Sequence, residues 1–511
     1  MTEFTDHGRT AGSARVIRLG EDMEPASGRS YRDGLVDEAI YGLWRKNPSL
    51  SARVVLDKRQ KVVGTLMLVV AVVVVIVWPR PVAIAAFGAV GLSFLVSVGF
   101  KFWSSMRGAR VESHFRTAVQ PARMPDCELP KYTVLVPVFK EANIVGQLVD
   151  NLGGIDYPAD KLEILVLVEE ADPETLQAAL RADPPTNFSF VVVPASQPQT
   201  KPKACNVGLQ LATGEFLVIY DAEDKPDPDQ LRKAVSAFRA HGDDLVCVQA
   251  ALNYFNSSEN VLTRMFTLEY SFWFDYMLPG LDFERLPIPL GGTSNHFRMS
   301  GLRKLGGWDP FNVTEDADLG IRTSAEGMRV GVIDSTTMEE ANTSIPNFVR
   351  QRSRWIKGYL QTVLVHIRHP ADLVRVAGPR QAISFLFLVA GTPATFLTVP
   401  ILYLAFLISL CVGPDVLEAF FPGWLLWLNL FNLGFGSAMM VYVSMMGAFR
   451  RHRYSLVPWA ILNPLYWLLH SIAAYKALWQ LITKPHYWEK TEHGLTAASA
   501  HGSEGPAGDN S

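Results

Sequence analysis

Long apolar stretches constrain this 511-residue chain more than any other feature of its sequence. Residues 62–78 are almost unbroken aliphatic sequence, and residues 82–103 form a second such span after a short Pro-Arg-Pro turn. Each span approaches the ~20 residues that a helix needs to cross a bilayer. Further apolar blocks occupy residues 383–412, 424–449 and 457–482. The sequence therefore predicts a multi-pass membrane protein with membrane lipids as neighbours.

Basic residues beside the spans predict their orientation, because Lys and Arg collect on the cytoplasmic side. They cluster before the first span and after the second, whereas the turn between these spans holds only Arg80. The 414–422 loop has no Lys or Arg, and Arg450 and Arg451 follow the next block. We therefore expect the large segment after residue 103 on the cytoplasmic side of the cell inner (plasma) membrane.

The last apolar block leaves two topologies open. Residues 457–482 contain Asn463, His470 and Lys476, which is polar for a helix exposed to lipid. The composition favours a helix that lies at the cytoplasmic interface. Four crossings then result, and five would result if this block also crossed.

The chain divides into segments of different composition. We expect a cytoplasmic, partly disordered N-terminal region, a transmembrane hairpin, a cytoplasmic domain, a group of interfacial and transmembrane helices, a short polar segment and a disordered tail. Their ranges are 1–60, 61–103, 131–370, 380–482, 484–495 and 496–511.

The segment 131–370 predicts an α/β domain. Short apolar runs near residues 132–136, 162–168, 188–194 and 216–220 alternate with turns and with stretches of helical apolar spacing. This alternation is typical of a parallel sheet that helices cover on both faces.

Acidic residues follow three of these predicted strands: Glu141, Glu169 with Glu170, and Asp221 with Glu223. Ligands of parallel sheets bind outside the carboxyl ends of the strands. Carboxylates this close repel one another unless a cation or a function offsets the repulsion. The alternative is helix capping, since acidic residues suit a first helical turn. That alternative would have to apply at three separate places.

Three later stretches carry further candidate chemistry. Lys201 and Lys203 lie near a turn upstream of the acidic strand and suit a diphosphate, although lysines near a turn are commonly solvated. The stretch 314–316 (Thr-Glu-Asp) suits a site or the start of a helix. The stretch 351–355 (Gln-Arg-Ser-Arg-Trp) offers guanidinium and indole groups, which suit a phosphate-and-sugar site or an interfacial anchor. No glycine-rich phosphate-binding motif occurs in the sequence.

Composition excludes other classes. A net charge of −3 gives no electrostatic footprint for nucleic acid. The four cysteines are scattered, so they indicate neither a zinc site nor a disulfide framework.

Taken in order, these motifs resemble a family 2 glycosyltransferase of the processive, membrane-integrated kind, similar to cellulose, curdlan and hyaluronan synthases. Asp221-Ala222-Glu223 resembles the family's DxD element, 314–316 its TED element and 351–355 its Q(Q/R)xRW element. The stretch 290–294 resembles the loop that lines the acceptor sugar. The resemblance implies a glycosyltransferase A-type fold: a Rossmann-like α/β domain with a mostly parallel sheet, inserted in an α-helical transmembrane bundle.

The resemblance also implies roles for individual residues. Asp221 and Glu223 would bind a divalent cation, Mg²⁺ or Mn²⁺, and Asp316 would be the general base. The nucleotide-sugar donor would be bound by Glu141, Glu169, Glu170, Lys203, Asp221, Glu223 and Arg354. The acceptor would be bound by Gly292, Thr293, Ser294, Glu315, Gln351 and Trp355.

A gating segment is a further expectation. The FxVTxK pattern of cellulose synthases is absent as such, but Trp488, Lys490 and Thr491 lie at the comparable place after the last apolar block.

The function that this resemblance implies is inverting, processive transfer of a sugar from a UDP-sugar, UDP-glucose foremost, to a growing β-linked polysaccharide. The polymer would leave through the membrane bundle, with export partner proteins as candidate neighbours. Two alternatives stay open: non-processive transfer to a lipid phosphate, and a transporter or carbohydrate-binding scaffold with a degenerate transferase domain.

Overall fold

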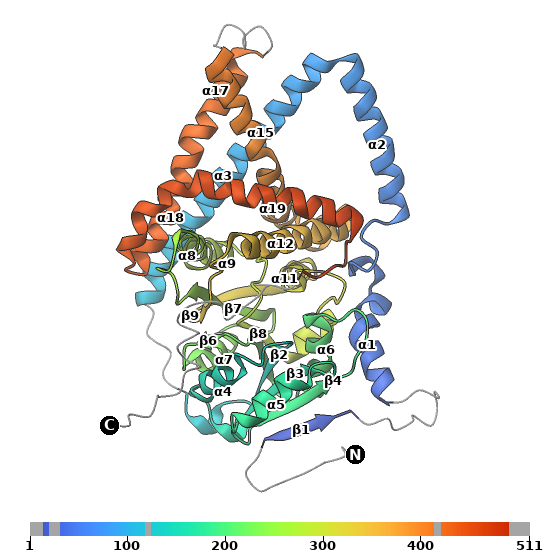
Figure 1. The fold of residues 1–511 in the computed structure, drawn as a ribbon, viewed down its shortest axis with the longest axis vertical. Helices are drawn as coiled ribbons and strands as arrows, with labels where there is room; N and C mark the ends of the chain where they lie inside the picture. The colour runs from blue at the N-terminus through green and yellow to red at the C-terminus, as the bar shows by residue number, and fades with distance from the viewer. Residues whose placement is uncertain (1–13, 20–30, 118–123, 413–420, 490–511) are drawn as a thin grey trace, which may run out of the picture.

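The structure is a computed structural model that describes residues 14–19, 31–117, 124–412 and 421–489 (Figure 1). The predicted gating residues Lys490 and Thr491 and the predicted tail lie outside the described residues.

Within the described chain, nine strands form one sheet in the order β1-β4-β3-β2-β5-β8-β7-β9-β6. The strands are β1 (Arg15–Arg18), β2 (Tyr132–Val138), β3 (Leu162–Glu169), β4 (Phe188–Val193), β5 (Phe216–Ile219), β6 (Lys225–Pro226), β7 (Leu245–Tyr254), β8 (Asn295–Arg298) and β9 (Arg329–Glu339). The strands from β1 to β5 in this order pair in parallel, as do β7 and β9, whereas β8 and β6 pair antiparallel. The predicted mostly parallel α/β sheet is therefore confirmed.

Helices cover both faces of the sheet because the central strands are apolar on both sides. On one face, the core contains side chains of α4 (Val145–Gly153), α5 (Pro173–Arg181) and α7 (Gln230–Ala240). On the other face, α6 (Lys201–Leu211) and α10 (Met299–Leu305) contribute to a second core. Two buried faces explain why these strands read as continuous apolar runs.

The described part of the N-terminal region is docked on this domain. Strand β1 extends the sheet beside β4, and helix α1 (Tyr31–Lys46) packs against α6. The Asn206 side-chain amide donates a 2.8 Å hydrogen bond to the carbonyl oxygen of Ala39. The Asp309 carboxylate accepts hydrogen bonds from the Ser51 hydroxyl at 3.1 Å and from the Ala52 amide at 2.5 Å.

Five helical stretches of the described chain are long and apolar enough to cross a membrane. They are residues 58–77, 79–110, 379–411, 423–450 and 454–483. The helices that form them are α2 (Lys58–Val77), α3 (Pro79–Thr117), α14 (Pro379–Phe385), α15 (Gly391–Val412), α17 (Gly423–Phe431), α18 (Ser437–Arg450) and α19 (Asn463–Thr483).

These helices differ in direction. In Figure 1, α2, α3, α15 and α17 extend away from the sheet, whereas α19 runs crosswise beside α12 (Ile345–His366). Residues of α19 pack against α12 along this contact.

Helix α3 continues past the predicted hairpin and joins the long apolar helices to the sheet domain. Its Gly108 lies so close to the turn before α9 (Leu278–Phe283) that an added Cβ would be 1.9 Å from the carbonyl oxygen of Tyr276. Gly280 makes the reciprocal approach to the carbonyl oxygen of Ser104, also at 1.9 Å from an added Cβ. Only a residue without a side chain permits this backbone contact.

Candidate active site

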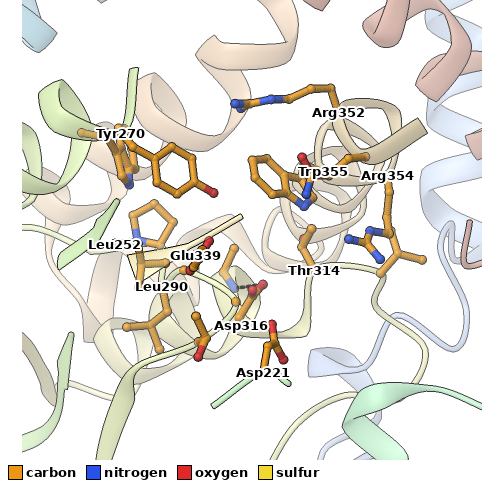
Figure 2. A pocket seen from close by; sticks show the side chains of 18 of the residues that line it. Asp221, Leu252, Tyr270, Leu290, Thr314, Asp316, Glu339, Arg352, Arg354 and Trp355 are labelled. Atoms are coloured by element: carbon orange, nitrogen blue, oxygen red, sulfur yellow. Dashed lines mark hydrogen bonds between the residues drawn. The ribbon is translucent and has the colours of Figure 1, made fainter. Parts of the chain in front are cut away.

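A cavity of about 380 Å³ opens at the carboxyl ends of β2 and β5 and continues between the long apolar helices. Its walls include α11 (Glu315–Ala325), α12 and the end of β9 on the sheet side. On the other side they include residues of α3, α15, α18 and α19. Figure 2 shows that Asp221, Asp316, Glu339, Arg354 and Trp355 converge on this space.

Cationic neighbours balance only part of the negative charge of the acidic residues after β5. Asp224 is fully buried, and its carboxylate accepts hydrogen bonds from the Asp221 amide at 2.7 Å and from the Thr293 hydroxyl. Burial raises the pKa of Asp224 well above its usual value, and Asp221 and Glu223 raise it further. Its second oxygen, Oδ1, has no hydrogen-bond partner within the described chain.

Glu339, at the end of β9, adds another carboxyl group to this cluster. Burial raises its pKa well above the usual range, and Asp224, Glu223 and Asp221 contribute to the rise. Its Oε1 atom is buried without a hydrogen-bond partner among the residues that the structure describes. The sequence offered no signal for Glu339, because its strand pairs with β7 rather than with a predicted neighbour.

Helix capping does not account for these acidic residues. Helix α7 begins at Gln230 after Asp229, well beyond Asp221 and Glu223. Helix α5 is capped by Asp172, whose carboxylate accepts from the Thr175 amide at 3.3 Å.

The two lysines at the start of α6 have different partners. Lys201 forms an ion pair with Asp221 and donates a 2.7 Å hydrogen bond to the carbonyl oxygen of Gly292. Lys203 is completely buried, with its ammonium 2.8 Å from Glu169 and 3.1 Å from the carbonyl oxygen of Pro194. Residues two apart on a helix do not share a face. The phosphate contact predicted for Lys203 therefore needs correction, since Lys201 is the lysine that faces Asp221.

The three glutamates after β2 and β3 that are predicted to bind the nucleotide sugar are only partly brought together. Glu141 and Glu169 line the cavity, but Glu170 does not. Glu170 forms a 2.6 Å ion pair with Arg32 of α1 and accepts a 3.0 Å hydrogen bond from the Ala195 amide. Helix α1 of the N-terminal region thus binds the carboxylate of Glu170, which the family resemblance assigned to donor binding.

Glu315 and Asp316 begin α11 and are buried at the cavity. Burial raises the pKa of Glu315 to about 8, and the adjacent Asp316 adds to the rise. Burial also raises the pKa of Asp316, whose carboxylate accepts a 2.6 Å hydrogen bond from the Ala317 amide. The motif does begin a helix, as the alternative expected, with Thr314 at the N-cap position, although the Thr314 side chain makes no capping hydrogen bond.

The two arginines of α12 point in different directions (Figure 2). Arg352 makes two hydrogen bonds with Glu269 of α8 (Val261–Phe272), at 2.8 and 2.6 Å. Arg354 lies toward the acidic cluster, where burial lowers its pKa and the carboxylates of Glu315 and Asp316 raise it in part.

The indole of Trp355 lines the cavity, and the Arg352 guanidinium lies 4.5 Å from its ring centre. This position differs from that of an interfacial anchor. Gln351 also lines the cavity, and its Oε1 accepts a 2.8 Å hydrogen bond from Asn342.

The loop before β8 supplies two of its three predicted residues to the cavity. Gly292 and Thr293 line it, although the Thr293 hydroxyl is already bonded to Asp224 and to the carbonyl oxygen of Ile219 at 3.1 Å. Ser294 is fully buried outside the cavity lining, and its hydroxyl donates to Thr337 at 2.6 Å. The acceptor role expected for Ser294 is therefore not supported by its position.

Trp488, the predicted gating residue that the structure describes, also lines the cavity. The Arg354 guanidinium lies 4.8 Å from its ring centre. The segment is held against α12, because Lys357 donates to the carbonyl oxygen of Tyr487 at 2.6 Å.

The donor set at Asp221 and Glu223 fits a divalent cation that a bound diphosphate helps to hold. Among the described residues, no group of three or more His, Cys, Asp or Glu side chains forms a complete metal site. Mg²⁺ is commonly bound by one or two carboxylates together with substrate phosphates. The unpartnered carboxyl oxygens of Asp224 and Glu339 agree with a site that takes up further positive charge.

The fold is an α/β domain with an acidic site at the carboxyl ends of its parallel strands. A buried aspartate and an Arg-Trp pair face this site, and these features together define the class of protein. Residues 130–358 match the family model described as "Glycosyltransferase like family 2", so this part of the chain is similar to family 2 glycosyltransferase domains.

Two curated relatives and one solved structure are similar to this chain. The probable glycosyltransferase YdaM of Bacillus subtilis is 27% identical over 241 residues, which cover 46% of this chain and 57% of the relative. Glucomannan 4-beta-mannosyltransferase 1 of Oryza sativa is 26% identical over 238 residues, which cover 45% of each protein. The chain thus matches about half the length of these relatives.

The solved structure is a mannosyltransferase from Pyrobaculum calidifontis in complex with GDP-Man and Mn²⁺. It is 19% identical, with a TM-score of 0.49, and the match covers 77% of this chain and 99% of that one.

Proposed function

We propose that this protein is an inverting glycosyltransferase that extends a β-linked polysaccharide from a nucleotide sugar. The observation that supports this proposal most is the convergence on one cavity of Asp221, Asp316, Arg354 and Trp355, which come from three distant parts of the sequence.

The donor would bind at the carboxyl ends of β2, β3 and β5. Glu141 and Glu169 line the side where the nucleoside would lie, and Asp221 and Glu223 would face its diphosphate. A divalent cation, Mg²⁺ or Mn²⁺, held by these two carboxylates would neutralise charge on the diphosphate. Arg354 would stabilise the negative charge that develops as the diphosphate leaves.

Asp316 would act as the general base. The acceptor hydroxyl attacks the anomeric carbon of the donor sugar, its proton passes to the Asp316 carboxylate, and the bond to the diphosphate breaks. A single displacement of this kind inverts the configuration at the anomeric carbon. Trp355 offers an aromatic face on which the acceptor sugar would stack.

The cavity suggests where a growing chain would go. Beyond Trp355 it continues to Tyr466, Trp467 and His470 of α19. Trp467 also lines a second cavity of about 400 Å³ among α3, α15, α17 and α18. The side-chain oxygens of Asn429 and Asn432 in that cavity are buried and have no partner in the described chain, so they would accept hydrogen bonds from sugar hydroxyls.

The topology that we propose has four crossings, with the site on the cytoplasmic side of the plasma membrane. Residues directly before and after the 454–483 stretch contact the sheet domain. Before it, Arg453 donates a 3.1 Å hydrogen bond to the carbonyl oxygen of Tyr254. After it, the carbonyl oxygen of Pro485 accepts a 3.0 Å hydrogen bond from Gln361. A stretch whose two flanks contact the same domain would not cross the bilayer.

The donor sugar is a further part of the proposal. The family resemblance favours UDP-glucose, whereas the name of the Oryza sativa relative favours a nucleotide-mannose donor. Both belong in the first assay, together with a lipid-phosphate acceptor for the non-processive alternative.

The test is nucleotide release by the purified full chain with a panel of UDP- and GDP-sugars, followed by linkage analysis of the product. We expect one donor to be consumed and EDTA to stop the reaction. The Asp316→Asn variant should lose ~10²–10⁴-fold in turnover while it still binds the donor. Full activity of Asp316→Asn or full activity in EDTA would refute the assigned roles.

A further inference from the structure

Lys201 places a cation inside the acidic site, and the mechanism proposed above gives it no role. Its ammonium forms an ion pair with Asp221 and donates a 2.7 Å hydrogen bond to the carbonyl oxygen of Gly292. The side chain is 18% exposed, so the ammonium is largely removed from water. Burial alone would lower the pKa of Lys201, but Asp221 and Glu315 hold it above its usual value.

The surroundings of Lys201 are strongly acidic. Four carboxyl groups interact with its charge: Asp221, Glu315, Asp316 and Glu339. Glu223 and Asp224 adjoin Asp221 in the same acidic cluster. Lys201 stabilises the ionised forms of Glu315, Asp316 and Glu339 through its charge. Since like charges in a buried site repel, Lys201 reduces the repulsion at the centre of this cluster.

A divalent cation at Asp221 would compete with this ammonium. Both would lie beside the same carboxylate group, and two cations this close repel strongly in a partly buried site.

A diphosphate would offset this repulsion, because its oxygens can bind the ammonium group and the divalent cation at the same time. Thr200, directly before Lys201, also lines the cavity, and its buried hydroxyl has no partner in the described chain. A phosphate oxygen beside Lys201 would supply that partner.

We infer that Lys201 is a tethered counter-ion of the donor site, which neutralises Asp221 while the site is empty and moves to the donor's diphosphate when donor and divalent cation bind together. This inference rests on the function proposed above. It implies that the site binds a divalent cation weakly alone and more tightly together with a nucleoside diphosphate.

The test measures Mn²⁺ binding to the detergent-purified full chain without nucleotide, from the electron paramagnetic resonance signal of free Mn²⁺. Lys201→Gln removes the charge and keeps a hydrogen-bond donor for Gly292. We expect it to bind Mn²⁺ at least ~5-fold more tightly than the wild type, the lower end of typical coupling between two ligands. In EDTA the same variant should bind UDP or GDP at least ~5-fold more weakly.

Two variants serve as controls. Lys201→Arg keeps the charge and should bind Mn²⁺ as the wild type does. Lys225→Gln removes a charge from β6, where the side chain is exposed and outside the cavity lining, and should also leave Mn²⁺ binding unchanged.

Unchanged or weaker Mn²⁺ binding by Lys201→Gln would overturn the inference, as would the absence of Mn²⁺ binding in every variant. If neither Lys201→Gln nor Lys201→Met folds, as judged by thermal melting, Lys201 is a structural lysine and the inference fails. Sugar transfer by the same wild-type preparation separates the two proposals. Its loss with every donor would refute the proposed function, whereas transfer with no effect of Lys201→Gln would refute only the role of Lys201.

Discussion

Buried carboxyl groups are the feature that sets the chemistry of this site at the scale of single residues. Asp316 lies in the cavity opposite Asp221, and burial raises its pKa. A raised pKa makes a carboxylate a stronger base once it is ionised, which suits the removal of a proton from a sugar hydroxyl. The same burial lowers the free energy of unfolding when the carboxyl groups of the cluster are ionised.

The loss of folding stability can be measured at Glu315. Its pKa is about 8 in the folded protein against an ordinary value of 4.5. Between these pH values the folded state keeps a proton that the unfolded state releases, so stability is lost as the pH rises from 4.5 to 8. Glu315→Gln cannot ionise and should remove this loss.

We therefore expect the melting temperature of Glu315→Gln to fall less than that of the wild type between pH 5.5 and pH 8.5. Glu326→Gln, an exposed position directly after the same helix, is the matched control and should follow the wild type. Parallel melting curves for Glu315→Gln and the wild type would show that Glu315 is not held protonated by burial.

At the scale of elements, the site depends on how α8, α12 and α19 are fixed to one another. Arg352 of α12 makes two hydrogen bonds with Glu269 of α8, and Tyr466 of α19 donates to the same carboxylate at 2.8 Å. Burial would raise the pKa of Glu269, but Arg352 and His470 lower it to about 2. This carboxylate therefore joins three helices around the cavity.

Loss of Arg352 should release α12 from α8. Arg352→Met leaves Glu269 without its main partner, and hydrogen bonds to charged groups contribute about 1.5–3 kcal/mol each. We expect a lower melting temperature for Arg352→Met and for Glu269→Leu. The double variant should lose clearly less than the sum of the two, because the pair is removed together. Additive losses would mean that the pair does not couple the helices.

The sequence patterns predicted the helices and strands better than they predicted the contacts between side chains. Strands β2 to β5 follow from apolar runs that end in turn residues, because both faces of the sheet are buried. The sequence did not show whether Lys201 or Lys203 faces Asp221, since both lysines fit the same pattern. The position of each lysine at the start of α6 decides this. Glu339 and Glu269 escaped prediction because they reach the site through strand and helix pairings between distant parts of the chain.

At the scale of the whole molecule, the sheet domain and the long helices share one continuous cavity. Figure 1 shows α19 lying crosswise between the sheet domain and the ends of the other long helices. In our account this helix and α12 lie at the membrane interface, so a product that leaves the site would pass between them and the bundle.

Cysteine labelling tests this topology. After replacement of the exposed Cys127 and Cys411, single cysteines at His452 and Lys484 should be protected from a membrane-impermeant thiol reagent in intact cells. Both side chains are exposed in the structure, so protection would reflect the membrane. A cysteine at Glu418, in the predicted outer loop, should be labelled. Labelling at Lys484 with protection at His452 would show that residues 454–483 cross the bilayer.

The central claim is that one chain both transfers the sugar and extends a polymer. The most direct measurement is the size of the product that the purified full chain makes from a radiolabelled donor in the presence of Mg²⁺ or Mn²⁺. Our account predicts a long, β-linked polysaccharide with wild-type protein, and only short products with Trp355→Ala, which lacks the aromatic face for the acceptor. A product that carries a single sugar on a lipid, or no incorporation from any nucleotide sugar, would contradict the account.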